Sequence, residues 1–218
     1  MKILGIDEAG RGPVLGPLVM CGYLIDSKKS GKLIDAGAKD SKQLSPAQRE
    51  EIAVRIRKLA DDFVLLSVSA EEIDSLRTFS NLNKIEIERM QQMILATTPD
   101  VAIIDAPEVN TKAFAEKIRK KVGDDVKLIC ENFADARHPP VSAASILAKV
   151  HRDSEIEKLK QKYGDLGSGY PHDERTINFL KEWLILNKSF PPFVRKSWIT
   201  AQALLKEKQQ KRLGDFYS

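Results

Sequence analysis

Four carboxylates that follow apolar stretches are the residues of this sequence best suited to chemistry. Asp7 and Glu8 end one such stretch, Asp105 ends the stretch VAII, and Asp135 lies shortly after a third at residues 126–131. Acids brought together repel one another and raise each other's pKa values, so keeping them all ionised is energetically costly. Bound divalent cations remove this cost. Mg²⁺ and Mn²⁺ prefer such oxygen ligands, and two ions about 4 Å apart can hold a phosphodiester for attack by water. Each acid alone is more commonly a turn residue or a helix N-cap, and the sequence leaves both interpretations open.

The elements that must position these acids are apolar strands alternating with helices. Strands are predicted at residues 2–7, 17–25, 63–69, 101–105 and 126–131. Helices are predicted at residues 46–60, 70–76, 81–96, 111–121, 141–163, 174–187 and 194–207. The first of these helices has a serine N-cap, Ser45, and a proline at its first position, Pro46. This order predicts an α/β fold with a mixed sheet.

The chain changes character after residue 164, where a turn-rich loop is followed by helical patterns alone. We therefore predict a sheet domain at residues 1–165, a small helical subdomain at residues 166–208 and a flexible tail at residues 209–218.

The composition is that of an ordinary globular protein, with 42% hydrophobic and 30% charged residues. The net charge of +4 and the pI of about 8.9 are only mildly basic, so they say little about a nucleic-acid partner. Cys21 and Cys130 lie in apolar runs and indicate free thiols in a reducing compartment. Asp7 and Glu8 interrupt the first apolar stretch, which argues against a signal peptide, and no stretch is long enough to span a membrane. We expect a cytoplasmic protein.

Four blocks of this sequence resemble the type 2 ribonucleases H, in the same order as in that family. They are GIDEAGRGPVLGPLV at residues 5–19, KDSKQL at 39–44, VSAASILAKVHRD at 141–153 and KYGDLGSGYPHD at 162–173. The likeness covers residues 2–198 and is greatest to the short archaeal form. It implies a ribonuclease H-like fold, with a five-stranded mixed sheet flanked by helices and a C-terminal helical subdomain that binds substrate.

The resemblance also implies an activity and a site. The activity is endonucleolytic cleavage of the RNA strand of RNA/DNA hybrids, and of single ribonucleotides embedded in duplex DNA, during DNA replication and repair. Asp7, Glu8, Asp105 and Asp135 match the catalytic and metal-binding acids of the family, with Asp7 bridging two Mg²⁺ or Mn²⁺ ions. One ion would lower the pKa of a water and the other would stabilise the leaving 3′ oxygen, which leaves 5′-phosphate and 3′-hydroxyl ends.

The resemblance assigns recognition of the ribose to Gly10, Arg11 and Gly12. Glycines let backbone amides and carbonyls approach a 2′-hydroxyl, and Arg11 can contact a phosphate. The simpler alternative is a hairpin turn that needs positive φ. Tyr170 matches the tyrosine that packs on the deoxyribose 3′ to the ribonucleotide, although a tyrosine in such a loop can equally anchor the loop in the core.

Several basic residues are candidates for phosphate contacts, although each alone is more commonly a solvated surface charge: Lys39, Lys42, Arg137, Lys149 and Arg152. Lys42, Arg137 and Lys149 are favoured by their matching blocks or by a neighbouring acid. Ser142 either caps the long helix near the site or simply packs there. For His138 we prefer a surface position between prolines to a role as general base.

The last residues form the pattern Q-x-x-L-x-x-F-Y, with Gln210, Leu213, Phe216 and Tyr217. This pattern resembles the peptide that docks on the sliding clamp PCNA. A one-turn helix would place the three apolar side chains on one side, while Gln210 reaches a polar pocket. The alternative is a tail folded back on its own subdomain.

Two other functions compete with a monomeric ribonuclease H. One is a clamp-tethered nucleic-acid-binding module with merely structural acids, which the intact set of acids argues against. The other is a two-metal nuclease of the same fold acting on DNA alone. The turn at Arg11 and the ring of Tyr170 argue against it, because such an enzyme has no need to sense a 2′-hydroxyl.

Overall fold

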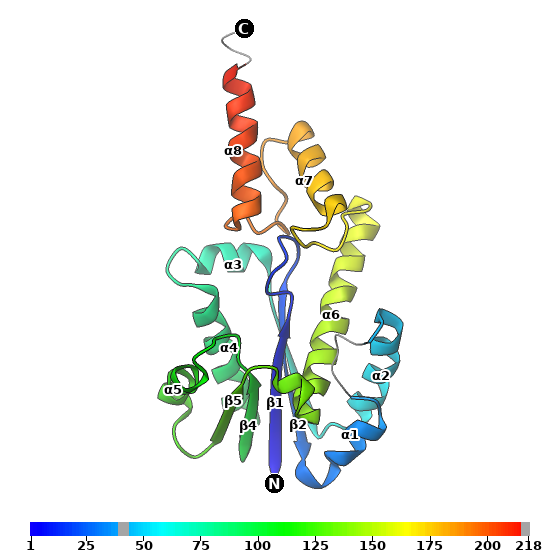
Figure 1. Cartoon of the computed structure of the whole chain (residues 1–218), viewed down its shortest axis with the longest axis vertical. Coiled ribbons are helices and arrows are strands. Elements are labelled where there is room, and N and C mark those ends of the chain that lie inside the picture. Colours follow the sequence, from blue (N-terminus) through cyan, green and yellow to red (C-terminus); the bar gives the residue numbers. More distant parts are fainter. Residues whose placement is uncertain (39–43, 215–218) are drawn as a thin grey trace. The chain divides into compact units, whose positions relative to one another are not determined.

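The computed structural model describes residues 1–38 and 44–214, and for residues 211–214 it describes the backbone alone (Figure 1). The chain divides into two compact units. The first contains residues 1–9, 19–67 and 81–151, and the second contains residues 10–18, 68–80 and the chain from residue 152 onward.

The first unit is built on a five-stranded sheet with the order β3-β2-β1-β4-β5. The strands are β1 (Lys2–Ala9), β2 (Leu18–Asp26), β3 (Asp62–Val68), β4 (Val101–Asp105) and β5 (Lys127–Glu131). β2 runs antiparallel to β1, whereas β4 runs parallel to both β1 and β5. The predicted mixed sheet and α/β fold are therefore confirmed.

Helices cover both faces of this sheet. They are α1 (Gly31–Asp35), α2 (Pro46–Leu59), α4 (Leu82–Thr97), α5 (Thr111–Val122) and α6 (Pro139–Tyr163), with the 3₁₀ turns η1 (Ser27–Lys29) and η3 (Ala134–Ala136). The odd-numbered residues of β2 pack with α1, α2 and α6, while a Cβ at Gly22 would lie 3.3 Å from the sulfur of Met93 in α4. The alternation of side chains along a strand thus assigns α6 to one face and α4 to the other.

The start of α6 lies directly against β1. A Cβ at Gly5 would come within 2.3–2.5 Å of backbone atoms of Pro140 and Val141, so only glycine allows this approach. Gly5 and Asp7 point to the same face of β1, because side chains alternate. Asp7 is thereby aimed at α6.

The second unit is held by an apolar cluster of its own. Its helices are α3 (Ala70–Leu76), α7 (Glu174–Leu186) and α8 (Ile199–Gly214). Leu166, Leu180 and Val194 are buried in the cluster, with Tyr163 and Trp183 packed against it. Asp173 caps α7 through the backbone N–H of Arg175, at 3.0 Å.

Two predicted helices differ from the observed ones by more than one residue at an end. α6 begins at Pro139 rather than at residue 141, and the helix predicted at 194–207 is α8, from Ile199 to Gly214. Residues 194–198 are not helical. The backbone N–H of Arg195 in this segment donates to the carbonyl of Val14. No helix in the described ranges is long and apolar enough to cross a membrane.

Candidate functional site

Three of the four predicted acids meet in the first unit. Asp7, Asp105 and Asp135 each place a carboxylate oxygen within 4.8 Å of the others. They come from β1, from the end of β4 and from the turn η3. Asp7 is 4% exposed and Asp135 is 3% exposed, so solvent screens the repulsion between their carboxylates only weakly. The oxygen ligands and their spacing fit a hard divalent cation.

Backbone geometry fixes two of these acids. The N–H of Ala134 donates to Oδ1 of Asp105 at 3.0 Å, which ties η3 to the end of β4. Asp105 pairs with Glu131 in the parallel ladder between β4 and β5. Phe133, just before η3, has a left-handed backbone with φ 59° and ψ 36°. This turn brings Asp135 back toward β4.

The environment of Asp7 has opposing effects on its charge. Burial raises the pKa of Asp7 to about 7, against the attraction of Lys149 and a hydrogen bond from Ser145, which lower it; the negative charge of Asp105 raises it. Lys149 Nζ donates to Ser145 Oγ at 2.7 Å. A divalent cation at this position would favour the ionised carboxylate in the same way that Lys149 does, and more strongly.

Glu8 does not join the group formed by the three aspartates. It is the next residue of β1 after Asp7, so its side chain leaves the strand on the opposite face. Its role as a metal ligand stays a prediction.

The predicted phosphate-binding residues have different surroundings. Lys149 lies at the acids, as described above, and Ser142 is buried on α6 with 1% exposure. Arg137 forms an ion pair with Glu131 at 3.0 Å and donates to the carbonyl of Asn132 at 2.6 Å. His138 also contacts Glu131, at 3.1 Å, and is partly buried.

Sequence reasoning missed Ser145. This fully buried serine lies one helical turn before Lys149 and three residues after Ser142, so all three share one face of α6. The i, i+3, i+7 spacing of polar residues within an otherwise apolar helical segment was the signal that could have found it.

The glycine-rich turn belongs to the second unit. Gly10 has φ 83°, and a Cβ there would lie 2.6 Å from the carbonyl oxygen of Pro17, so the turn needs glycine both for its positive φ and for this close backbone approach. A Cβ at Gly12 would lie 3.6 Å from the ring of Tyr170. Tyr170 is half-buried, with the guanidinium of Arg152 5.3 Å from its ring centre. Gly12, predicted to recognise the ribose, and Tyr170, predicted to pack on the following deoxyribose, are therefore neighbours.

A buried arginine that the sequence did not single out organises this turn. Arg195 has no exposed surface and donates to the carbonyls of Gly16, Arg11 and Gly10 at 3.0, 3.0 and 2.6 Å. Burial, reinforced by repulsion from Arg152, lowers the pKa of Arg195 to about 9, which leaves it charged at neutral pH. Arg195 lies between Val194 and Lys196. A single arginine carries no periodic signal, so sequence reasoning had no means of finding it.

Other predicted residues lie outside the described part of the chain or at its edge. Lys39, Lys42, Phe216 and Tyr217 lie outside the described residues, as does the side chain of Leu213. Gln210 is exposed near the end of α8. Arg152, considered for phosphate contact, is 7% exposed and donates to the carbonyl of Ser168 at 2.8 Å, a structural role.

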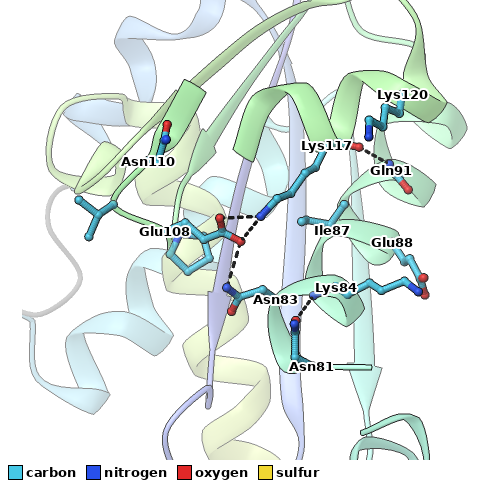
Figure 2. Close-up of a pocket in the computed structure, with 12 residues that line it drawn as sticks. Asn81, Asn83, Lys84, Ile87, Glu88, Gln91, Glu108, Asn110, Lys117 and Lys120 are labelled. Atoms are coloured by element: carbon cyan, nitrogen blue, oxygen red, sulfur yellow. Dashed lines mark hydrogen bonds and ion pairs between the residues drawn. The ribbon is translucent and has the colours of Figure 1, made fainter. Parts of the chain in front are cut away.

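A polar cleft of about 760 Å³ lies beside the loop that follows β4 (Figure 2). Glu108 on this loop accepts hydrogen bonds from Asn83 at 3.0 Å and from Lys117 at 2.8 Å. Asn132 donates to the carbonyls of Ala106 and Glu108, at 2.7 and 3.0 Å. These contacts anchor the loop on both sides and so help to fix Asp105 at its start.

Comparisons with known proteins agree on one family. The family model described as Ribonuclease HII matches residues 4–201. A ribonuclease HII of Pyrococcus abyssi is 47% identical over 94% of this chain and 91% of its own length. The crystal structure of ribonuclease H2 from Pyrococcus horikoshii matches with a TM-score of 0.91 and 43% identity, covering 96% of this chain and 100% of that one. Ribonuclease HII from Archaeoglobus fulgidus, solved in a complex with PCNA, matches with a TM-score of 0.85 and 40% identity, covering 93% of this chain and 96% of that one.

Proposed function

The chain belongs to the ribonuclease HII family, and from that premise we propose that it cleaves RNA by two-metal hydrolysis at Asp7, Asp105 and Asp135. Membership makes it a metal-dependent endonuclease that acts on RNA paired with DNA. We propose in addition that it cuts at single ribonucleotides embedded in duplex DNA and serves their removal in replication and repair. The observation that carries the proposal is the convergence of three buried or half-buried carboxylates within 4.8 Å.

Mg²⁺ or Mn²⁺ ions, when bound, would activate a water and stabilise the leaving 3′ oxygen. We assign Asp7 to both ions, and Asp105 and Asp135 would complete their ligands, with Glu8 as a fourth acid. Lys149 offsets part of the negative charge at Asp7. We propose that cleavage leaves 5′-phosphate and 3′-hydroxyl ends.

Recognition of the ribonucleotide is assigned to the turn of Gly10, Arg11 and Gly12. Arg195 already uses the carbonyls of Gly10 and Arg11 and holds the turn in shape. We propose that backbone groups of this turn pair with the 2′-hydroxyl, and that the ring of Tyr170 packs on the deoxyribose that follows.

Contacts to the phosphate backbone are assigned to Lys42, Arg137, Lys149 and Ser142. Such contacts fix position without reading sequence. For Arg137, binding a phosphate means exchanging its ion pair with Glu131, so we expect it to contribute less than an uncommitted arginine would.

A gel assay on duplex DNA with one embedded ribonucleotide tests the nuclease proposal. We expect cleavage on the 5′ side of the ribonucleotide with Mg²⁺ or Mn²⁺ and none in EDTA. Asp7→Asn should lose cleavage by a factor of about 100 or more while it keeps substrate affinity, because the amide cannot replace a bridging carboxylate. Lys158→Met, an exposed change on the same α6, serves as the control.

Full activity of Asp7→Asn would remove Asp7 from the mechanism. Cleavage of a matched all-DNA duplex at the same rate would instead favour a DNA nuclease and would contradict the assigned role of the glycine turn.

We also propose that the C-terminal segment binds the PCNA sliding clamp through Gln210, Leu213, Phe216 and Tyr217. Two observations support it: the sequence pattern of the segment, and the solved complex of PCNA with the Archaeoglobus fulgidus relative. We retain the division into residues 1–165, 166–208 and 209–218, the monomeric state and the cytoplasmic location as parts of the same proposal.

A further inference from the structure

Phe133 presents an exposed aromatic ring next to the metal-binding acids. Its side chain is 69% exposed, and it lies two residues before Asp135. The following residue, Ala134, donates its N–H to Asp105. The ring therefore projects from the same turn that brings two of the acids together.

The backbone conformation of Phe133 is also unfavourable. At φ 59° and ψ 36° it is left-handed, a conformation that glycine and asparagine adopt readily and that bulky residues avoid. Two contacts at this turn use backbone donors: the N–H of Ala134 donates to Asp105, and the N–H of Ala136 donates to the carbonyl of Phe133 at 3.2 Å. A glycine here would make the same two backbone bonds without strain. Strained positions of this kind concentrate at functional sites.

A second exposed apolar side chain lies on the neighbouring loop. Val109 follows β4 by four residues and is 95% exposed. Asn132, adjacent to Phe133, donates to the carbonyl of Glu108, adjacent to Val109, at 3.0 Å. Together with the bond from Asn132 to the carbonyl of Ala106, this hydrogen bond links the two loops that carry these side chains. Both loops begin at strands ending beside the acids.

We propose that the ring of Phe133 contacts a nucleotide of the bound substrate, packing on the flat face of its base or sugar, and that Val109 extends this apolar contact. Bases and sugars offer apolar faces whatever the sequence, so such a contact adds affinity without base specificity. The inference rests on the proposed nuclease function and deepens it, because it names Phe133 as a residue that positions the substrate beside the acids.

Binding of a duplex with one embedded ribonucleotide, measured in EDTA so that no cleavage occurs, tests the contact. Phe133→Ala should raise Kd by a factor of about five or more, the usual loss when a stacking ring is removed. Phe133→Tyr should bind within about twofold of the parent. Phe79→Ala is the matched control, since Phe79 is an exposed phenylalanine with 88% exposure, and it should leave Kd unchanged.

Phe133→Gly separates binding from structure. It removes the ring and relieves the left-handed strain, so it should melt no lower than the parent chain and still lose affinity by the same factor as Phe133→Ala. KM should rise in both variants, while kcat and the Mn²⁺ concentration for half-maximal activity stay within about twofold.

Unchanged Kd in both Phe133→Ala and Phe133→Gly would overturn the inference. So would a fall in kcat or an altered Mn²⁺ requirement with Kd unmoved, because the ring would then act on the acids rather than on the substrate. A parent chain that binds the duplex but never cuts it would instead refute the proposed nuclease function, and the ratio of Kd values would still decide the role of Phe133.

Discussion

At the scale of single residues, the charge on Asp7 depends on a balance between burial and the ammonium group of Lys149. Burial is the larger effect and raises the pKa of Asp7 from 3.8 to about 7. Between pH 3.8 and about pH 7, the folded, metal-free chain therefore keeps Asp7 protonated, whereas the unfolded chain has released this proton. The stabilisation from this proton is complete below about pH 4 and is lost as pH rises through 7.

This balance predicts how stability depends on pH in EDTA. Between pH 5 and pH 8 the parent chain should lose at least about 2 kcal/mol of unfolding free energy relative to Asp7→Asn, since one pKa unit corresponds to about 1.4 kcal/mol. The asparagine is similar in shape but cannot titrate. Denaturant unfolding at the two pH values measures the difference, and added Mn²⁺ should stabilise the parent more at pH 8 than at pH 5. Parallel pH curves for the two proteins would contradict the assignment.

At the scale of elements, the glycine turn owes its shape to a buried guanidinium. Arg195 donates to the carbonyls of Gly10, Arg11 and Gly16. The indole N–H of Trp198 donates to the carbonyl of Gly12 at 3.2 Å. The turn is thus held from the C-terminal part of the chain. Glycine supplies the permitted conformation, and Arg195 selects one conformation among those permitted.

Arg195→Met should therefore cost about 3 kcal/mol or more of unfolding free energy, because three buried carbonyls lose a charged donor. Arg195→Lys should recover part of this loss, since an ammonium group can reach fewer of the carbonyls. Arg55→Met, which removes an exposed ion pair with Glu51, should cost less than about 1 kcal/mol. Chemical denaturation of the three variants checks the order, and an Arg195→Met protein as stable as Arg55→Met would refute this role.

Most helices and strands could be predicted from the sequence because their signals are local. Apolar runs ended by Asp7 and Asp105, and the Ser45–Pro46 start of α2, are local signals that survive in the fold. The positions of Ser145 and Arg195 depend on contacts between distant segments, and no local pattern records such contacts. The sheet order β3-β2-β1-β4-β5 has the same origin. Three of the four predicted acids meet, and the role of Glu8 as the fourth stays a prediction.

At the scale of the whole molecule, the modest charge of +4 gives little long-range attraction for a polyanion. Affinity for nucleic acid must then come from local contacts and from tethering to a partner that is already on DNA. A segment that binds the clamp would raise the effective concentration of the nuclease at DNA that carries a clamp.

The tether can be tested with a peptide of residues 207–218. We expect it to bind PCNA, and we expect Phe216→Ala with Tyr217→Ala to weaken binding by a factor of about 100 or more, because buried aromatic anchors dominate such interfaces. Calorimetry with both peptides measures this. A matched full chain with the same two changes should bind a clamp-free duplex as the parent does. Equal binding of PCNA by the two peptides would end the proposal.

The contact between Gly5 and α6 has a consequence for how this protein can change over evolutionary time. When a larger side chain presses on another side chain, a second mutation can shrink the partner and restore the fit. The atoms facing Gly5 belong to the main chain of Pro140 and Val141, and no mutation removes a main chain. A substitution at this position therefore has no compensating partner, and lineages that drift freely at its neighbours should keep a glycine here.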